Sequence, residues 1–178
     1  MDENFTEIYE LIKGKITTSI SKPIIICIDG RGGSGKSIIT TKLLTNLKDS
    51  LLVELDCFPT KGGLYDRESI KNNFDFDWSE IEYDIAPITT KIEKSKAKII
   101  IVEGCFSFKN LPWLNKDLLI WVEVDRETCF HRLMQREARK IDLPLKTIKL
   151  ANISWQQSED KYIQSFPPQN KAHVTVSS

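Results

Sequence analysis

Residues able to bind phosphate groups are concentrated in one short segment. Gly30 to Ser37 reads Gly-Arg-Gly-Gly-Ser-Gly-Lys-Ser and fits G-x-x-x-x-G-K-[ST], the pattern of a phosphate-binding loop. Its four glycines let the backbone turn several N–H groups inward with no Cβ in the way. The segment therefore predicts a nucleoside triphosphate site. The residues expected to contact the nucleotide are Gly30, Arg31, Gly32, Gly33, Ser34, Gly35, Lys36, Ser37 and Ile38.

The sequence around this loop fits the mechanism. A β-branched run precedes it, and residues 37–44 have helical apolar spacing, so the positive end of a helix dipole would face the phosphates. We expect Lys36 to reach the β- and γ-phosphates and the Ser37 hydroxyl to bind Mg²⁺. The alternative is a glycine-rich turn that merely precedes a helix. The loop does not by itself determine what happens to the γ-phosphate.

Two carboxylates follow apolar runs that are predicted as strands. Asp56 follows residues 51–55 and Glu103 follows residues 98–102, so both are expected at the carboxyl edge of the sheet. Asp56 could accept the proton of an attacking hydroxyl or hold a metal-bound water, or it could only cap a loop. Glu103 could bind Mg²⁺ through water, contact the acceptor, or serve as a helix cap.

A basic segment covers residues 126–150, with seven Lys or Arg against three acidic residues. At 100° per residue its arginines lie opposite an apolar face. Those arginines are Arg132, Arg136 and Arg139, and the apolar residues are Phe130, Leu133, Met134 and Ile141. The arginines either form a solvated face or belong to a lid helix that offsets charge on a transferring phosphoryl group. Pro144 stands where such a lid would turn back.

Five apolar runs alternate with helical patterns along the chain: 23–28, 51–55, 98–102, 118–124 and 173–176. Nearly continuous apolar strands are typical of a parallel sheet that is covered on both faces. The prediction is an α/β protein: a three-layer α/β/α P-loop NTPase fold, mainly parallel and five-stranded, in a single domain over residues 1–178. An amphipathic helix over 2–20 should cover the sheet, although its apolar face could also pack between subunits.

Composition excludes several classes of protein. The chain has 178 residues, with 25 basic and 25 acidic side chains, and the lack of net charge argues against nucleic-acid binding. No apolar run approaches the roughly 18 residues that span a bilayer, and the N-terminus does not resemble a secretion signal. Free thiols are favoured over disulfides or a metal site for the four scattered cysteines. A cytoplasmic protein is expected.

Other P-loop classes fit less well. Leu114 to Asp117 comes close to the guanine-reading Asn-Lys-x-Asp tract of GTP switches, but it precedes its strand and is interpreted as a turn. A motor ATPase would normally have a larger chain and an acidic pair where Glu103 stands alone. A small-molecule phosphotransferase is favoured.

The ordered motifs resemble the uridine kinase and phosphoribulokinase-like group of P-loop kinases, particularly its short bacterial uridine-kinase-like members, from about Ile24 to Val176. The resemblance rests on Ile28 to Ser37, Leu55-Asp56-Cys57-Phe58, Ile101 to Gly104, Val124-Asp125 with Arg132, Arg136 and Glu137, and Trp155, Glu159, Tyr162, Pro167 and Ala172-His173. It implies an ATP- and Mg²⁺-dependent kinase in which Asp56 is the base and Lys36, Arg132 and Arg136 are catalytic.

The phosphoryl acceptor is the least determined part of this prediction. A nucleoside such as uridine leads, and another riboside, a vitamin precursor, a sugar, or a non-catalytic nucleotide sensor are the alternatives. The aromatic and acidic tract at 73–78 could hold a base and a ribose or could anchor a helix. The stretch between Pro87 and Lys98 is short for the hairpin that covers the nucleoside in uridine kinases. ATP or GTP preference, oligomeric state and lid closure stay open.

Overall fold

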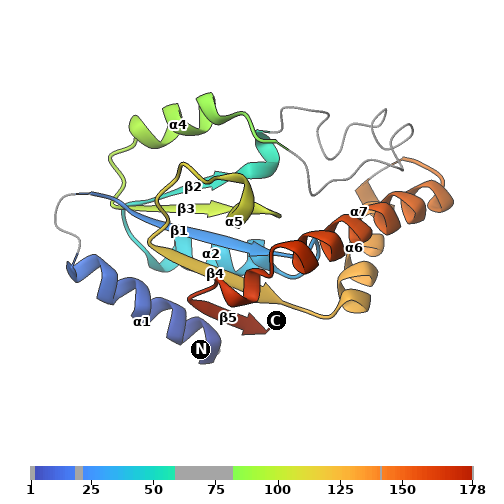
Figure 1. Ribbon diagram of the computed structural model, residues 1–178, viewed down its shortest axis with the longest axis horizontal. Helices are drawn as coiled ribbons and strands as arrows, with labels where there is room; N and C mark the ends of the chain where they lie inside the picture. Colours follow the sequence, from blue (N-terminus) through green and yellow to red (C-terminus); the bar gives the residue numbers. More distant parts are fainter. Residues whose placement is uncertain (1–2, 19–21, 59–81, 141, 178) are drawn as a thin grey trace.

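One parallel sheet organises the molecule (Figure 1). The computed structural model describes residues 3–18, 22–58, 82–140 and 142–177. Within these ranges the five strands pair in the order β2-β3-β1-β4-β5, and each neighbouring pair is parallel. The strands are β1 (Ile24–Gly30), β2 (Ser50–Glu54), β3 (Ile99–Glu103), β4 (Leu118–Glu123) and β5 (Val174–Ser177).

Helices cover both faces of the sheet. Side chains from α1 and α2 fill the core on one face, and side chains from α4, α5 and α7 fill the core on the other. Helices α6 and α7 pack together and extend beyond the carboxyl ends of the strands (Figure 1). The α-helices are α1 (Glu3–Thr18), α2 (Lys36–Asn46), α4 (Ile85–Glu93), α5 (Ser107–Asn110), α6 (Arg126–Lys140) and α7 (Leu145–Ser165); the 3₁₀ turns are η1 (Leu55–Cys57) and η3 (Pro168–Asn170).

The apolar runs supply both cores through the two-residue period of a strand. Ile26 and Ile28 of β1 face α1 and α2, whereas Cys27 between them faces α4, α5 and α7. The side chains of β3 alternate in the same way: Ile101 lies in the core beside α1 and α2, and Ile100 lies in the core beside α4, α5 and α7. Continuous apolar strands therefore produce a sheet buried on both faces, and the predicted three-layer α/β/α fold is confirmed.

The amphipathic N-terminal helix packs inside the chain. Phe5, Ile8 and Ile12 of α1 are buried against the even-numbered side chains of β1 and β4. This answers the question of where its apolar face goes: it covers the sheet. None of the described helices combines the length and apolarity that would be needed to cross a membrane.

The structure locates two further segments that the sequence singled out. The basic segment 126–150 reverses where the sequence placed a turn, because α6 ends at Lys140 and α7 begins at Leu145, directly after Pro144. A proline disfavours helical geometry in the residue before it, which fits a break at this point. Leu114 to Asp117 is an irregular, bent segment that leads into β4, and Asp117 accepts a hydrogen bond from the Ile25 amide at 2.9 Å. All four cysteines are free, and Cys57 is the exposed one.

The double-sided core predicts a large stability effect at the centre of β3. Ile100 is fully buried, so Ile100→Ala removes several buried methyl groups and leaves a cavity. We expect its free energy of unfolding to fall by about 2–5 kcal/mol. Leu145→Ala is the control, since Leu145 is 63% exposed and its loss should cost less than about 0.5 kcal/mol. Urea denaturation of both variants tests this, and equal losses would contradict the burial.

Candidate active site

The phosphate-binding loop joins β1 to α2 at the carboxyl edge of the sheet. Gly33 and Gly35 have φ values of 82° and 95°, in the left-handed region that favours glycine. A Cβ added to Gly33 would also lie 2.7 Å from the carbonyl oxygen of Cys129. Both positions therefore require glycine, which explains the glycine-rich pattern physically.

Several loop amides remain available to an anion. Three loop amides already donate hydrogen bonds within the protein: Gly30 to Asp29, Gly32 to Glu159, and Ser34 to the Arg31 carbonyl oxygen. Within the part of the chain that the structure describes, no internal hydrogen bond engages the other four amides from 33 to 37. These belong to Gly33, Gly35, Lys36 and Ser37, all of which line one cavity. Converging amides at a helix N-terminus form a phosphate cradle.

Lys36 is a buried cation at the floor of this cavity. Its Nζ donates to the carbonyl oxygens of Gly30 and Arg31, both at 2.9 Å, and lies 3.3 Å from Cys105 Sγ. Burial lowers the pKa of Lys36, but the negative groups around it, Glu103 among them, raise that pKa by more. The ammonium group therefore keeps its charge at neutral pH.

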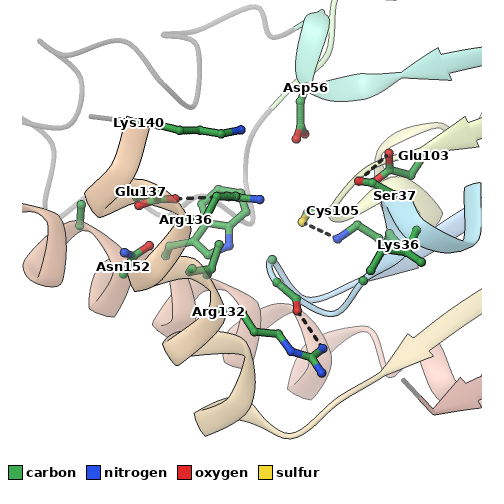
Figure 2. Close-up of a pocket in the computed structure, with 17 residues that line it drawn as sticks. Lys36, Ser37, Asp56, Glu103, Cys105, Arg132, Arg136, Glu137, Lys140 and Asn152 are labelled. Atoms are coloured by element: carbon green, nitrogen blue, oxygen red, sulfur yellow. Dashed lines mark hydrogen bonds and ion pairs between the residues drawn. The ribbon is translucent and has the colours of Figure 1, made fainter. Parts of the chain in front are cut away.

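The two predicted carboxylates lie on the same cavity, which has a volume of about 640 Å³. Asp56 lies in η1 directly after β2, and Glu103 is the last residue of β3. The Ser37 hydroxyl lies 3.4 and 3.5 Å from the two Glu103 carboxylate oxygens. Figure 2 shows Ser37 and Glu103 beside Lys36, with Asp56 pointing into the space between this group and helix α6.

Both carboxyl groups have raised pKa values. Loss of solvent is the main cause at Asp56, where Lys36 and then Arg136 act in the opposite direction. Loss of solvent also dominates at Glu103, where Lys36 opposes it and Asp56 adds to it. The negative charge of Asp56 thus disfavours the charged form of Glu103, and a nearby cation would relieve that repulsion.

Helix α6 forms the opposite wall. Arg132 Nη1 donates to the Gly33 carbonyl oxygen at 3.3 Å, so this arginine lies over the phosphate loop. Arg136 lines the cavity one turn later and is 3.3 Å from Glu137, whereas Arg139 does not line it. The face predicted from helix geometry therefore reaches the cavity through Arg132 and Arg136. The apolar side is less sharply separated than expected, since Leu133 lines the cavity as well.

Only some of the other residues predicted to contact the nucleotide line the cavity. Gly32 and the exposed Ile38 line the cavity, but Gly30, Arg31 and Ser34 do not. The Arg31 guanidinium instead lies against α7, 2.7 Å from Asp160. The tract at 73–78, considered for the acceptor, lies outside the described residues.

Sequence reasoning missed several lining residues: Cys105, Lys140, Ala151 and Asn152. Lys140 stands four residues after Arg136 on the same helix face, a spacing that could have identified it. Cys105 follows the strand-ending Glu103 by two residues, but the sequence indicates no more than a free thiol there. Asn152 carried no local signal, because it reaches the cavity through the packing of α7 on α6.

Comparison with known proteins supports the same group of kinases. No family model matches the sequence. A uridine kinase of Saccharomyces cerevisiae is 27% identical over 158 residues, a match that covers 70% of this chain. The matched region is 32% of the yeast protein, so the chain spans about a third of the length of that relative.

Two solved structures share the fold. A candidate fructose transport system kinase from Silicibacter sp. TM1040 superposes with a TM-score of 0.68 at 15% identity, covering 97% of this chain and 98% of the other. A candidate uridine kinase from Bacillus stearothermophilus gives a TM-score of 0.59 at 14% identity, with 95% and 98% covered. Together with the curated relative and the ordered motifs, they confirm the predicted resemblance: in sequence and fold, the chain is like the uridine-kinase-like P-loop kinases.

Proposed function

We propose that this protein is an ATP-dependent kinase that transfers the γ-phosphoryl group to a hydroxyl of a small molecule, most simply a nucleoside such as uridine. One observation carries the proposal: the phosphate loop, Asp56 and two arginines of α6 line a single cavity. Phosphoryl transfer to a hydroxyl requires three components: a triphosphate site, a carboxylate base, and cationic side chains that offset the charge on the transferring group.

The nucleotide would be held from the loop side. The amides of Gly33, Gly35, Lys36 and Ser37 would donate to phosphate oxygens, and Lys36 would leave the loop carbonyls for the β- and γ-phosphates. Ile38, which is 63% exposed at the cavity, would contact the nucleotide next to the loop. Gly30, Gly32 and Ser34 would shape the loop without touching phosphate.

The donor set fits Mg²⁺. The Ser37 hydroxyl and the Glu103 carboxylate lie side by side, and oxygen ligands are those that Mg²⁺ prefers. No group of three or more His, Cys, Asp or Glu is clustered among the described residues, which fits a metal held by one or two side chains together with substrate phosphates. When bound, Mg²⁺ would neutralise phosphate charge. Glu103 and Ser37 would fix its position.

Asp56 would accept the proton of the acceptor hydroxyl. As that oxygen bonds to the γ-phosphorus, the bond from the γ-phosphorus to the β,γ-bridging oxygen breaks and ADP leaves with the electron pair. Arg132 and Arg136 would offset the charge that spreads over the transferring group. An acceptor bound between Asp56 and α6 meets all three side chains.

The acceptor assignment rests on likeness to other kinases. The yeast relative is a uridine kinase, and one similar structure is a candidate uridine kinase, which supports a nucleoside; the fructose transport system neighbour supports a sugar as the alternative. An ATP-consuming reaction on a small metabolite is consistent with a cytoplasmic protein.

A transfer screen tests the proposal. The protein is incubated with ATP or GTP, MgCl₂ and a panel of nucleosides, other ribosides, vitamin precursors and sugars, and ADP and phosphorylated acceptor are measured together. We expect equimolar ADP and product with one acceptor class, and no product without Mg²⁺. Tight ATP binding with no transfer to any acceptor would overturn the enzyme assignment in favour of a nucleotide sensor.

A further inference from the structure

A buried carboxylate of helix α7 contacts the phosphate loop from outside the cavity. Glu159 is 2% exposed. Its Oε1 accepts hydrogen bonds from the Gly32 amide at 2.5 Å and from Trp155 Nε1 at 2.6 Å. Its Oε2 lies 3.6 Å from Arg31 Nη1, and neither of these two atoms has a hydrogen-bond partner. One side chain thus engages two consecutive loop residues and an aromatic neighbour.

The next residue connects the same loop to helix α6. Asp160 lies 2.7 Å from Arg31 Nη2 and 2.9 Å from Arg126 Nε, and Arg126 is the first residue of α6. Gln156 also donates to the Arg126 carbonyl oxygen at 2.7 Å. The contacts of α7 therefore hold the first half of the phosphate loop and the start of the arginine helix together.

We propose that Glu159 is a positioning residue for phosphoryl transfer: from α7 it fixes the Gly32 peptide and so holds the loop amides in register with Arg132 and Arg136. The inference rests on the proposed function for its link to catalysis. Its physical reason is that phosphate binding depends on several amides converging at once, and small misplacements of such groups cost large factors in rate. Glu159 does not line the cavity itself.

The charge of Glu159 is part of this arrangement. Burial raises the pKa of Glu159 to about 7. The Gly32 amide, Lys36, Arg31 and the Trp155 N–H act in the opposite direction, because each favours the charged carboxylate. Among the described residues, the other titratable groups that interact with Glu159 are Cys105 and Cys129 from neighbouring segments, and Asp160, next to it on α7, pairs with Arg31. Protonation would weaken acceptance from Gly32 and the pairing with Arg31, so ATP affinity should fall as pH drops through about 7.

Gly32 offers an independent steric test. A Cβ at this position would lie 2.9 Å from Trp155 Nε1 and 3.3 Å from Glu159 Oε1. Gly32→Ala should therefore push Trp155 and Glu159 away from the loop. Trp155→Phe removes the nitrogen that causes the closest clash, so the double variant should recover part of the ATP affinity that Gly32→Ala loses.

The experiment measures the ATP dissociation constant by calorimetry without an acceptor, from pH 6 to 8, and then KM and kcat with the best acceptor. Glu159→Ala is expected to weaken ATP binding by about 10- to 100-fold. Glu159→Gln keeps an oxygen for Gly32 and should stay within a few-fold of wild type at pH 8, but without the decline below pH 7. Glu127→Gln is the matched control, because Glu127 is an exposed glutamate of α6 that does not line the cavity.

The outcomes separate the two proposals. If no acceptor is ever phosphorylated, the ATP affinities still test the positioning of the loop. Wild-type ATP affinity in a folded Glu159→Ala protein, or a wild-type pH profile in Glu159→Gln, would overturn the inference. If Glu159→Ala fails to fold, the other variants decide. The inference would then be overturned if the Gly32→Ala/Trp155→Phe double variant recovers no ATP affinity and Glu159→Gln keeps the wild-type pH profile of ATP binding.

Discussion

Asp56→Asn should reduce kcat by about 10²–10⁴-fold while ATP binding stays within a few-fold of wild type. The amide has nearly the same shape as the carboxylate, so the cavity wall is preserved. The amide cannot accept the proton of the acceptor hydroxyl, which Asp56 is proposed to remove. Steady-state kinetics with the best acceptor, and ATP titration in its absence, measure the two effects separately.

The pH profile gives this prediction a second readout. A base works only when deprotonated, and loss of solvent raises the pKa of Asp56. The acid limb of kcat/KM should therefore lie at higher pH than the ordinary pKa of an aspartate would give, with activity falling as pH drops through it. This limb should disappear in Asp56→Asn.

Glu54→Gln is the control for Asp56. Glu54 is an exposed carboxylate at the end of β2, two residues away, and it does not line the cavity. It should change kcat less than twofold. Wild-type turnover in Asp56→Asn would refute its assignment as the base and leave the loop-capping interpretation.

Most of the sheet could be predicted because its strands are buried on both faces. Runs such as Ile24 to Ile28 and Ile99 to Val102 are apolar at every position, and this pattern alone distinguishes them from half-exposed strands. The carboxyl ends of the runs at 51–55 and 98–102 also indicated the positions of Asp56 and Glu103. Parallel strands bring such ends to one edge whatever their separation in sequence.

Other parts of the site could not be predicted because they depend on packing between distant segments. Arg31 was expected to contact nucleotide from its place in the loop, yet it pairs with Asp160, 129 residues later. Glu159 stands out in the sequence only as part of the C-terminal motif, and nothing local to it indicates that it accepts a hydrogen bond from the Gly32 amide. Asn152 and Trp155 reach the cavity because α7 packs against α6 after the turn at Pro144, and no local pattern in the sequence indicates that packing.

Arg136→Ala is expected to lower kcat by about 10³-fold, the lower end of what arginines contribute to phosphoryl transfer. Arg136 lines the cavity and lowers the pKa of Asp56 through its charge, so it acts on the region where the acceptor hydroxyl and the γ-phosphoryl group would meet. Arg139→Ala is the matched control, since Arg139 is an exposed arginine on the same helix that does not line the cavity. It should change kcat less than twofold.

Arg136→Lys separates catalysis from structure. Arg136 lies 3.3 Å from Glu137, whose side chain is only 12% exposed, so removal of the cation in Arg136→Ala also leaves a mostly buried carboxylate less well compensated. Lysine keeps a positive charge near Glu137 but lacks the planar fork that can hold two phosphoryl oxygens at once. We therefore expect Arg136→Lys to restore the melting temperature lost in Arg136→Ala while kcat stays at least tenfold below wild type. Recovery of both together would make the arginine a structural partner of Glu137, and unchanged kcat in a folded Arg136→Ala protein would assign it to a solvated basic face.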